Sequence, residues 1–265
     1  MPGEDILTLP PPAADLRVRY GPEPEQFADL RFAPARKTAP LAINIHGGYW
    51  RARYDLTHAG HLCGALAARG INAANVEYRR VATPVQPGTP TGESSWPRTF
   101  EDVRTAYRYL VQRAAELGIP GAPAVVLGHS AGGQLALCLA AHEKSVRNCI
   151  SLAGVLDLRR AWELHLSNDA VVEYLGGTPE QVPEHYREAS PMELKIPRAS
   201  QVIVHGLADD VVPFAISRDF AAAKKKRGEQ LQFVPIAEAN HFDVIDPRTK
   251  AFQLVADAAL RLLRA

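Results

Sequence analysis

The sequence has few cysteines and no pattern that would tie them together. Cys63, Cys138 and Cys149 are an odd number, and each lies in an apolar stretch rather than in a C-x-x-C or Cys/His cluster. A disulfide framework needs paired cysteines, and a zinc site needs clustered Cys or His ligands. We therefore expect three small buried side chains, no disulfide framework and no metal site.

Long hydrophobic runs and an excess of charge of one sign are also lacking. No apolar run approaches the ~20 residues that a membrane-spanning helix needs, and residues 1–15 have neither the basic start nor the apolar core of a signal peptide. The 30 basic residues nearly balance the 29 acidic ones, which argues against nucleic acid and membrane partners. We expect a cytoplasmic protein that acts on a small molecule, and the oligomeric state stays open, a homodimer included.

The sequence does contain an alternation of short apolar runs with longer amphipathic stretches. Its 265 residues, 46% of them hydrophobic, suffice for one large core. Strand-like runs lie at residues 41–45, 72–77, 124–127, 148–152, 201–204 and 231–235. Helix-like segments lie at residues 56–69, 100–118, 131–142, 214–227 and 250–263. This alternation predicts a single α/β domain over residues 1–265, with a mostly parallel sheet covered by helices on both faces.

Four further segments fall outside this alternation. Residues 16–20 and 29–32 are candidates for antiparallel edge strands. Residues 81–97 are rich in Pro, Gly, Ser and Thr, whereas residues 157–197 are mixed and partly helical, and each of these two segments follows a strand. Because ligands bind at the carboxyl ends of parallel strands, we expect residues 81–97 to form a rim and residues 157–197 a small cap or lid at that edge.

The strongest functional signal is the G-H-S-A-G sequence at residues 128–132. It follows a predicted strand and opens a predicted helix, which is the context in which a sharp turn exposes a nucleophilic serine. That turn tolerates only minimal side chains two residues before and after the serine, and glycine stands at both positions. A tight turn with a helix-capping serine is the alternative, and the strand-to-helix context argues against it. Ser130 is therefore the candidate nucleophile.

A second signal, H-G-G-Y-W at residues 46–50, comes directly after a predicted strand. Attack on a carbonyl creates an oxyanion, which fixed backbone N–H groups can stabilise. The glycines let the backbone approach closely, so the N–H groups of Gly48 and Tyr49, with that of Ala131, are candidates for an oxyanion hole. The alternative is a glycine turn whose aromatic side chains fill the core.

The acid and the base are expected after the last two predicted strands. Asp209 fits the D-x-x-V-P spacing of this kind of site, whereas Asp210 fits a helix cap. His241 follows the strand-like residues 231–235, and the chain order Ser130, Asp209, His241 is the order expected for α/β-hydrolases.

The other histidines near these motifs are poorer candidates for the base. His46 belongs to the predicted oxyanion turn. His129 is next to the nucleophile and is expected to point elsewhere. His205 lies at a strand end, where we expect a structural hydrogen bond.

With these motifs in place, the chain resembles the α/β-hydrolase superfamily from about residue 40 onward. The resemblance is to the branch of kynurenine formamidases and hormone-sensitive-lipase-like carboxylesterases. The pointers to formamidases are H-G-G-Y-W, where esterases of this branch usually carry H-G-G-G, and the H-F-D-V sequence at residues 241–244.

The resemblance implies a serine hydrolase that forms an acyl-enzyme and needs no cofactor. Its first implied activity is that of an arylformamidase acting on N-formylkynurenine-like substrates, and the alternative is a carboxylesterase acting on short-chain esters. The alternative of another class is an inactive binding protein on a hydrolase fold, which the presence of all the motif residues argues against.

Several side chains near the motifs are candidates for substrate contact. Four aromatic residues could stack on a planar substrate ring: Tyr49, Trp50, Trp96 and Trp162. Packing in the core or the cap is the stronger expectation for each tryptophan. Arg51 or Arg53 could pair with a substrate carboxylate, although nothing in the sequence places either arginine in the site.

Overall fold

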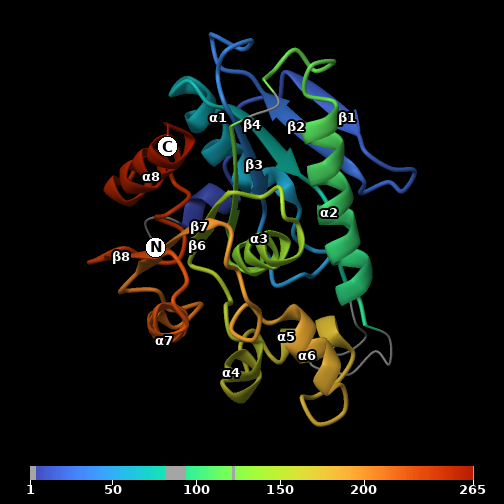
Figure 1. Cartoon of the computed structure of the whole chain (residues 1–265), viewed down its shortest axis with the longest axis vertical. Helices are drawn as coiled ribbons and strands as arrows, with labels where there is room; N and C mark the ends of the chain where they lie inside the picture. Colours follow the sequence, from blue (N-terminus) through green and yellow to red (C-terminus); the bar gives the residue numbers. More distant parts are fainter. Residues whose placement is uncertain (1–3, 82–93, 121–122, 265) are drawn as a thin grey trace.

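The computed structural model describes residues 4–81, 94–120 and 123–264. Most of the predicted rim at residues 81–97 therefore lies outside the described residues. Within them, eight strands form one sheet in the order β1-β2-β4-β3-β5-β6-β7-β8 (Figure 1). The strands are β1 (Leu16–Arg19), β2 (Phe27–Arg31), β3 (Leu41–Ile45), β4 (Asn72–Val76), β5 (Ala124–His129), β6 (Asn148–Leu152), β7 (Ser200–Gly206) and β8 (Leu231–Ile236).

The pairing of the strands confirms the predicted sheet. Strands β3 to β8 pair in parallel, while β1 and β2 are antiparallel at one edge, as expected from their position before the main alternation. All five residues of β3 and of β4 are buried. A parallel strand buried on both faces has no side that faces solvent, which is why these sequences do not alternate strictly between apolar and polar residues. The buried amides within them are paired, since Asn44 Nδ2 donates to Asn75 Oδ1 at 2.8 Å.

Helices cover both faces of the sheet, and each face has its own hydrophobic core. The helical elements are η1 (Glu4–Leu7), η2 (Leu56–Ala59), α1 (Gly60–Ala68), α2 (Trp96–Gln112), α3 (Ala131–His142), α4 (Leu158–Glu163), α5 (Ala170–Leu175), α6 (Pro183–Ala189), α7 (Phe214–Lys226) and α8 (Lys250–Arg264). Side chains of η1, α1 and α8 pack on one face, and those of α2, α3 and α7 pack on the other. The three cysteines are free and buried, as the sequence predicts.

The predicted helix at 100–118 is displaced toward the N-terminus, because α2 begins at Trp96 and ends at Gln112. Pro97 was assigned to the Pro-rich segment, but it occupies the first turn of α2. A proline is tolerated there because the first N–H groups of a helix have no partner within the helix.

The segment between β6 and β7 forms the small cap expected after the sixth strand. It contains α4, α5 and α6, which group together at the bottom of the view in Figure 1. Tyr174 of α5 and Tyr186 of α6 are fully buried and belong to the core on the α2 and α3 face. The cap is therefore packed onto the sheet domain by large side chains.

The sequence motifs all follow strands of the parallel part of the sheet. H-G-G-Y-W follows β3, and Ser130, Asp209 and His241 come after β5, β7 and β8. In a parallel sheet the carboxyl ends of the strands meet at one edge, so the topology assembles these motifs there. No helix in the described residues is long and apolar enough to cross a membrane.

Candidate active site

Ser130 lies in the tight turn that joins β5 to α3. Its φ of 56° and ψ of −120° are a conformation that L residues rarely adopt. A Cβ atom on Gly128 would lie 2.1 Å from the carbonyl oxygen of Gly132, and one on Gly132 would lie 2.0 Å from that of Ile45. Both glycines are therefore fixed by close backbone packing, which is what the G-x-S-x-G spacing predicts.

Asp209 and His241 are joined by a hydrogen bond of 2.7 Å from His241 Nδ1 to Asp209 Oδ2. The other carboxylate oxygen accepts the N–H groups of Val211 and Val212, at 2.9 and 2.8 Å. Burial raises the pKa of the Asp209 carboxyl, but hydrogen bonds from His205 and His241 outweigh burial and hold the pKa well below its usual range. Asp209 is thus ionised at neutral pH, whereas Asp210 is exposed.

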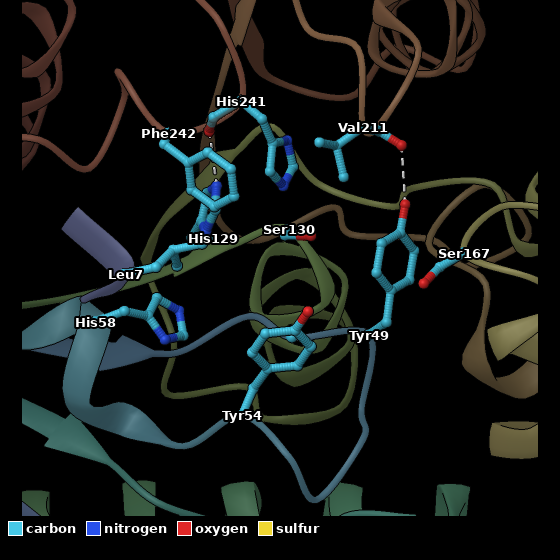
Figure 2. Close-up of a pocket in the computed structure, with 11 residues that line it drawn as sticks. Leu7, Tyr49, Tyr54, His58, His129, Ser130, Ser167, Val211, His241 and Phe242 are labelled. Atoms are coloured by element: carbon cyan, nitrogen blue, oxygen red, sulfur yellow. Dashed lines mark hydrogen bonds between the residues drawn. The ribbon is translucent and has the colours of Figure 1, made fainter. Parts of the chain in front are cut away.

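Ser130 and His241 line one pocket with a volume of about 360 Å³. Figure 2 shows the imidazole of His241 with its Nε2 directed toward Ser130. Leu7 and Phe242 give this pocket an apolar wall, and Tyr49 lines it too. Among the described residues, no group of three or more His, Cys, Asp or Glu side chains could hold a metal ion.

The turn after β3 lies directly against the serine turn. A Cβ atom on Gly47 would lie 3.1 Å from Cβ of Ser130. Gly48, Tyr49 and Trp50 all have positive φ, at 113°, 48° and 58°. In the described part of the chain, the N–H groups of Gly48, Tyr49 and Ala131 donate to no other residue.

His46 supports this turn from inside the protein. It is fully buried, its Nε2 lies 3.1 Å from Oε1 of Glu77, and its ring stacks on Tyr78. Burial lowers the pKa of His46 to about 3, so the imidazole is neutral. The residue belongs to the turn, as predicted, but it does not line the pocket.

His129 does not point away from the site, and this part of the sequence interpretation was wrong. Its ring centroid lies 4.5 Å from that of His241, and its Nε2 lies 2.9 Å from the backbone oxygen of His241. Burial lowers the pKa of His129 well below its usual value. The sequence could not reveal this contact because it depends on how the loop after β8 folds back onto the end of β5.

His205 makes the structural hydrogen bonds expected of it, and one of them reaches the candidate acid. Its Nε2 lies 3.1 Å from Oδ2 of Asp209 and 2.9 Å from the backbone oxygen of Val212. Its Nδ1 lies 2.7 Å from Oγ of Ser217. Because both partners of Nε2 are acceptors, Nε2 carries the proton and Nδ1 accepts the hydroxyl of Ser217 when the ring is neutral.

The three tryptophans named as substrate contacts do not line the pocket that the described residues form, so this interpretation is corrected. Trp50 is fully buried and stacks on Tyr174 with ring centroids 4.3 Å apart. Trp96 is buried beside the same tyrosine, and Trp162 is half-buried against the core. Trp50 and Trp96 thus hold the cap to the sheet domain through Tyr174, and all three rings pack in the core or the cap, which was the alternative weighed for them. Tyr49 does line the pocket, and its hydroxyl donates to the backbone oxygen of Val211 at 2.9 Å.

The two arginines do not face the pocket either. Arg51 is buried, and its guanidinium donates two hydrogen bonds of 2.7 Å to the carboxylate of Glu173. Arg53 is exposed and lies over the ring of Tyr54, 4.8 Å from its centroid. Because the charge of Arg51 is already paired within the protein, it is unavailable to a substrate carboxylate.

The sequence interpretation missed six residues that line the pocket: Leu7, Tyr54, His58, Ser167, Val211 and Phe242. Val211 lies inside the D-x-x-V-P spacing that begins at Asp209. Phe242 belongs to the H-F-D-V sequence, which could have marked it. The other four lie in the first helical turn, the segment after β3 and the cap, where no spacing rule connects them to the motifs.

Comparisons with known proteins identify a family and several esterases to which this chain is similar. Residues 29–223 match the model of the BD-FAE family. Esterase LipQ of Mycobacterium tuberculosis is 25% identical over 264 residues, which cover 91% of this chain and 60% of LipQ. Versiconal hemiacetal acetate esterase of Dothistroma septosporum is 32% identical over 106 residues, 40% of this chain and 29% of that protein. The chain thus spans at most 60% of the length of these two curated relatives.

Solved structures show the same fold over nearly the whole chain. A truncated carbohydrate esterase from gut microbiota superposes with a TM-score of 0.80 at 20% identity, covering 97% of this chain and 100% of that one. The thermophilic esterase Est2 of Thermogutta terrifontis, bound to propionate, gives a TM-score of 0.68 at 26% identity. The match covers 96% of this chain and 94% of that one. The α/β-hydrolase fold is thereby confirmed and the named relatives are esterases, whereas the kynurenine formamidase branch is not confirmed. Because the family match covers well over half of its residues, the chain belongs to the BD-FAE family.

Proposed function

We propose that the chain is a serine carboxylesterase that hydrolyses small esters with Ser130 as nucleophile, His241 as base and Asp209 as the orienting acid. One observation carries the proposal. Ser130 and His241 line the same pocket, and the ring nitrogen of His241 that faces away from Ser130 is hydrogen-bonded to an ionised carboxylate (Figure 2). A nucleophile, a base and a buried acid in this relation form the arrangement used for acyl transfer.

The proposed mechanism follows from the tautomer of His241. Its Nδ1 donates to Asp209, so Nε2 has a lone pair that can accept the proton of Ser130. The serine oxygen then attacks the ester carbonyl, while the N–H groups of Gly48, Tyr49 and Ala131 bind the oxyanion. His241 next protonates the leaving alcohol. Water attacks the acyl-enzyme by the same route and releases the acid.

The size of the pocket and one solved relative favour short acyl groups. A volume of about 360 Å³ lies near the small end of small-molecule sites. The Est2 esterase of Thermogutta terrifontis has been solved with propionate and with butyrate bound, and it is 26% and 25% identical to this chain in those structures. We therefore propose acyl groups of about this length as substrates.

Arylformamidase activity is the second candidate, and the H-G-G-Y-W and H-F-D-V sequences favour it. The same three residues would cleave a formamide, with His241 protonating a leaving amine. The curated relatives and solved structures named above are esterases, which supports the ester more strongly. Trp50, the last residue of H-G-G-Y-W, lies in the core rather than in the pocket.

The deciding experiment compares kcat/KM for p-nitrophenyl acetate, p-nitrophenyl butyrate and N-formylkynurenine. We expect the esters to exceed the formamide by about 100-fold, a difference of ~2.7 kcal/mol in the activation free energy. Ser130→Ala, measured in parallel, should lose turnover of every substrate. A similar preference for the formamide would instead establish a formamidase, and absence of turnover for all three would reject both candidates.

A further inference from the structure

The loop between α4 and α5 brings one polar side chain of the cap into the pocket. Among the described residues of the cap, only Ser167 lines the pocket that holds Ser130 and His241. Figure 2 shows Ser167 beside Tyr49, on the opposite side of Ser130 from Leu7 and Phe242. The pocket therefore has an apolar end and a polar end, with the proposed nucleophile between them.

The backbone of this loop is strained at Ser167 and around it. His165, Ser167, Asn168 and Asp169 have φ values of 51°, 51°, 53° and 57°, all in the left-handed region. Residues with a Cβ atom adopt that region only when surrounding contacts hold them in it. The position of Ser167 is thus imposed by other parts of the protein.

Arg51 supplies the contacts that hold the loop. Its Nη1 donates to Oγ of Ser167 at 3.0 Å, and its Nη2 donates to the backbone oxygen of Asn168 at 3.3 Å. The same guanidinium is fixed by the two hydrogen bonds to Glu173, whose side chain is fully buried. Because Arg51 follows the turn after β3, it ties the proposed oxyanion hole to the cap loop.

The contact with Arg51 determines what Ser167 can offer a substrate. A guanidinium has only donors, so the oxygen of Ser167 accepts and its own proton is not used in this bond. In the described part of the chain, the hydroxyl of Ser167 donates to no acceptor. An oriented donor that borders the pocket is therefore left for a ligand.

We propose that Ser167 binds the substrate by donating a hydrogen bond to an oxygen that lies beyond the ester being cleaved. The preferred substrates are then short esters with a hydrocarbon group on one side and an ether, hydroxyl or carbonyl oxygen on the side that faces the cap. Arg51 is a positioning residue, since it acts through Ser167. This inference rests on the proposed esterase function.

Two pairs of esters test the proposal, each differing by an oxygen in place of a methylene. The acyl pair is p-nitrophenyl methoxyacetate and p-nitrophenyl butyrate, and the alcohol pair is 2-methoxyethyl acetate and butyl acetate. For each pair, the kcat/KM of the oxygen ester is divided by that of the carbon ester. Comparing this ratio between wild type and variant cancels the intrinsic reactivity of the esters.

Ser167→Ala should lower the ratio about five-fold in at least one pair, as expected for loss of one neutral hydrogen bond. Ser167→Gly removes the same hydroxyl and also relieves the left-handed backbone, so it should lower the same ratio even if Ser167→Ala folds poorly. Ser145→Ala, on the exposed turn after α3, is the matched control and should leave both ratios unchanged. Unchanged ratios in both pairs for both Ser167 variants would overturn the proposal.

The role of Arg51 has its own readout. Arg51→Lys keeps the charge but loses the planar fork, so it should lower the same ratio as Ser167→Ala, through a higher KM for the oxygen ester. Arg53→Lys, which changes the exposed arginine two residues further along the chain, should leave that ratio unchanged. If wild type hydrolyses no ester at all, the proposed function fails; if turnover is intact but the ratios do not respond, only the role of Ser167 fails.

Discussion

At the scale of single residues, the ionised state of Asp209 depends on four donors. They are the N–H groups of Val211 and Val212 and the imidazoles of His205 and His241. Because these donors replace the water that would solvate the carboxylate, the free-energy cost of keeping it charged while shielded from solvent is small. The sequence distinguished Asp209 from Asp210 by spacing alone, but it could not show that a second histidine contacts the acid.

The choice between the two aspartates can be tested by exchange of either carboxylate for an amide. Asp209→Asn should lower kcat for an ester by about 10³–10⁴-fold, because an amide does not stabilise the imidazolium or hold the required tautomer of His241. Asp210→Asn, the control at an exposed neighbour, should keep nearly full activity. A larger loss for Asp210→Asn would show that the wrong carboxylate has been assigned.

Buried histidines with lowered pKa values, His46 and His58 as well as His129, make stability depend on pH. Burial lowers the pKa values of His46 and His58 to about 3 each, whereas the unfolded chain binds these protons near pH 6.5. Between pH 6.5 and 3 the unfolded state therefore holds more protons, so the free energy of unfolding falls as the pH falls. At pH 5 each of these two histidines should lower the free energy of unfolding by about 2 kcal/mol relative to its value at neutral pH.

Urea unfolding at pH 7.5 and pH 5 measures this loss. His58→Gln should reduce the difference between the two pH values, and replacement of the exposed His165 serves as the control. Equal stability of the wild type at both pH values would contradict neutral burial of these imidazoles.

At the scale of elements, the cap is attached through a buried ion pair as well as through aromatic packing. The side chains of Arg51 and Glu173 are at most 8% exposed. Removal of one member of a buried pair leaves the other charge without compensation, which costs far more than the pair contributes. The cap loop should therefore be sensitive to a single change at Glu173.

Glu173→Gln should destabilise the protein by about 3 kcal/mol, the low end of the range for breaking a buried pair. The control within the same cap is Glu163→Gln, which breaks an exposed pair with Arg160 and should cost about 0.5 kcal/mol or less. Thermal unfolding of both variants measures the difference. Equal effects would mean that the Arg51 pair contributes no more than a surface contact.

Elements were predicted well where a regular pattern governs them. The buried strands and the helices α3, α7 and α8 follow from hydrophobic spacing, and the serine turn follows from its glycines. The roles of Trp50 and Arg51 could not be inferred in the same way. Trp50 ends the H-G-G-Y-W motif that borders the site, and Arg51 follows it directly. The side chains of both turn toward the cap, and the sequence does not indicate which part of the cap packs on that turn.

At the scale of the whole molecule, the sheet brings together residues that are far apart in the chain. The strands before Ser130, Asp209 and His241 end at the same edge, so chain order and topology together predicted this grouping. The pocket walls depend on segments with no shared pattern. Leu7 comes from the first helical turn, and Ser167 comes from a strained cap loop, so the substrate preference could not be read from the sequence motifs.

The central claim is that Ser130 is the nucleophile of an esterase. The most direct test treats the protein with a fluorophosphonate, a reagent that reacts with an activated serine. Peptide mass spectrometry locates the adduct. The turnover of p-nitrophenyl butyrate is followed during the reaction. We predict one adduct per chain, on Ser130, formed in parallel with the loss of turnover and absent in Ser130→Ala. An adduct on another residue, or full turnover after complete modification of Ser130, would contradict the account.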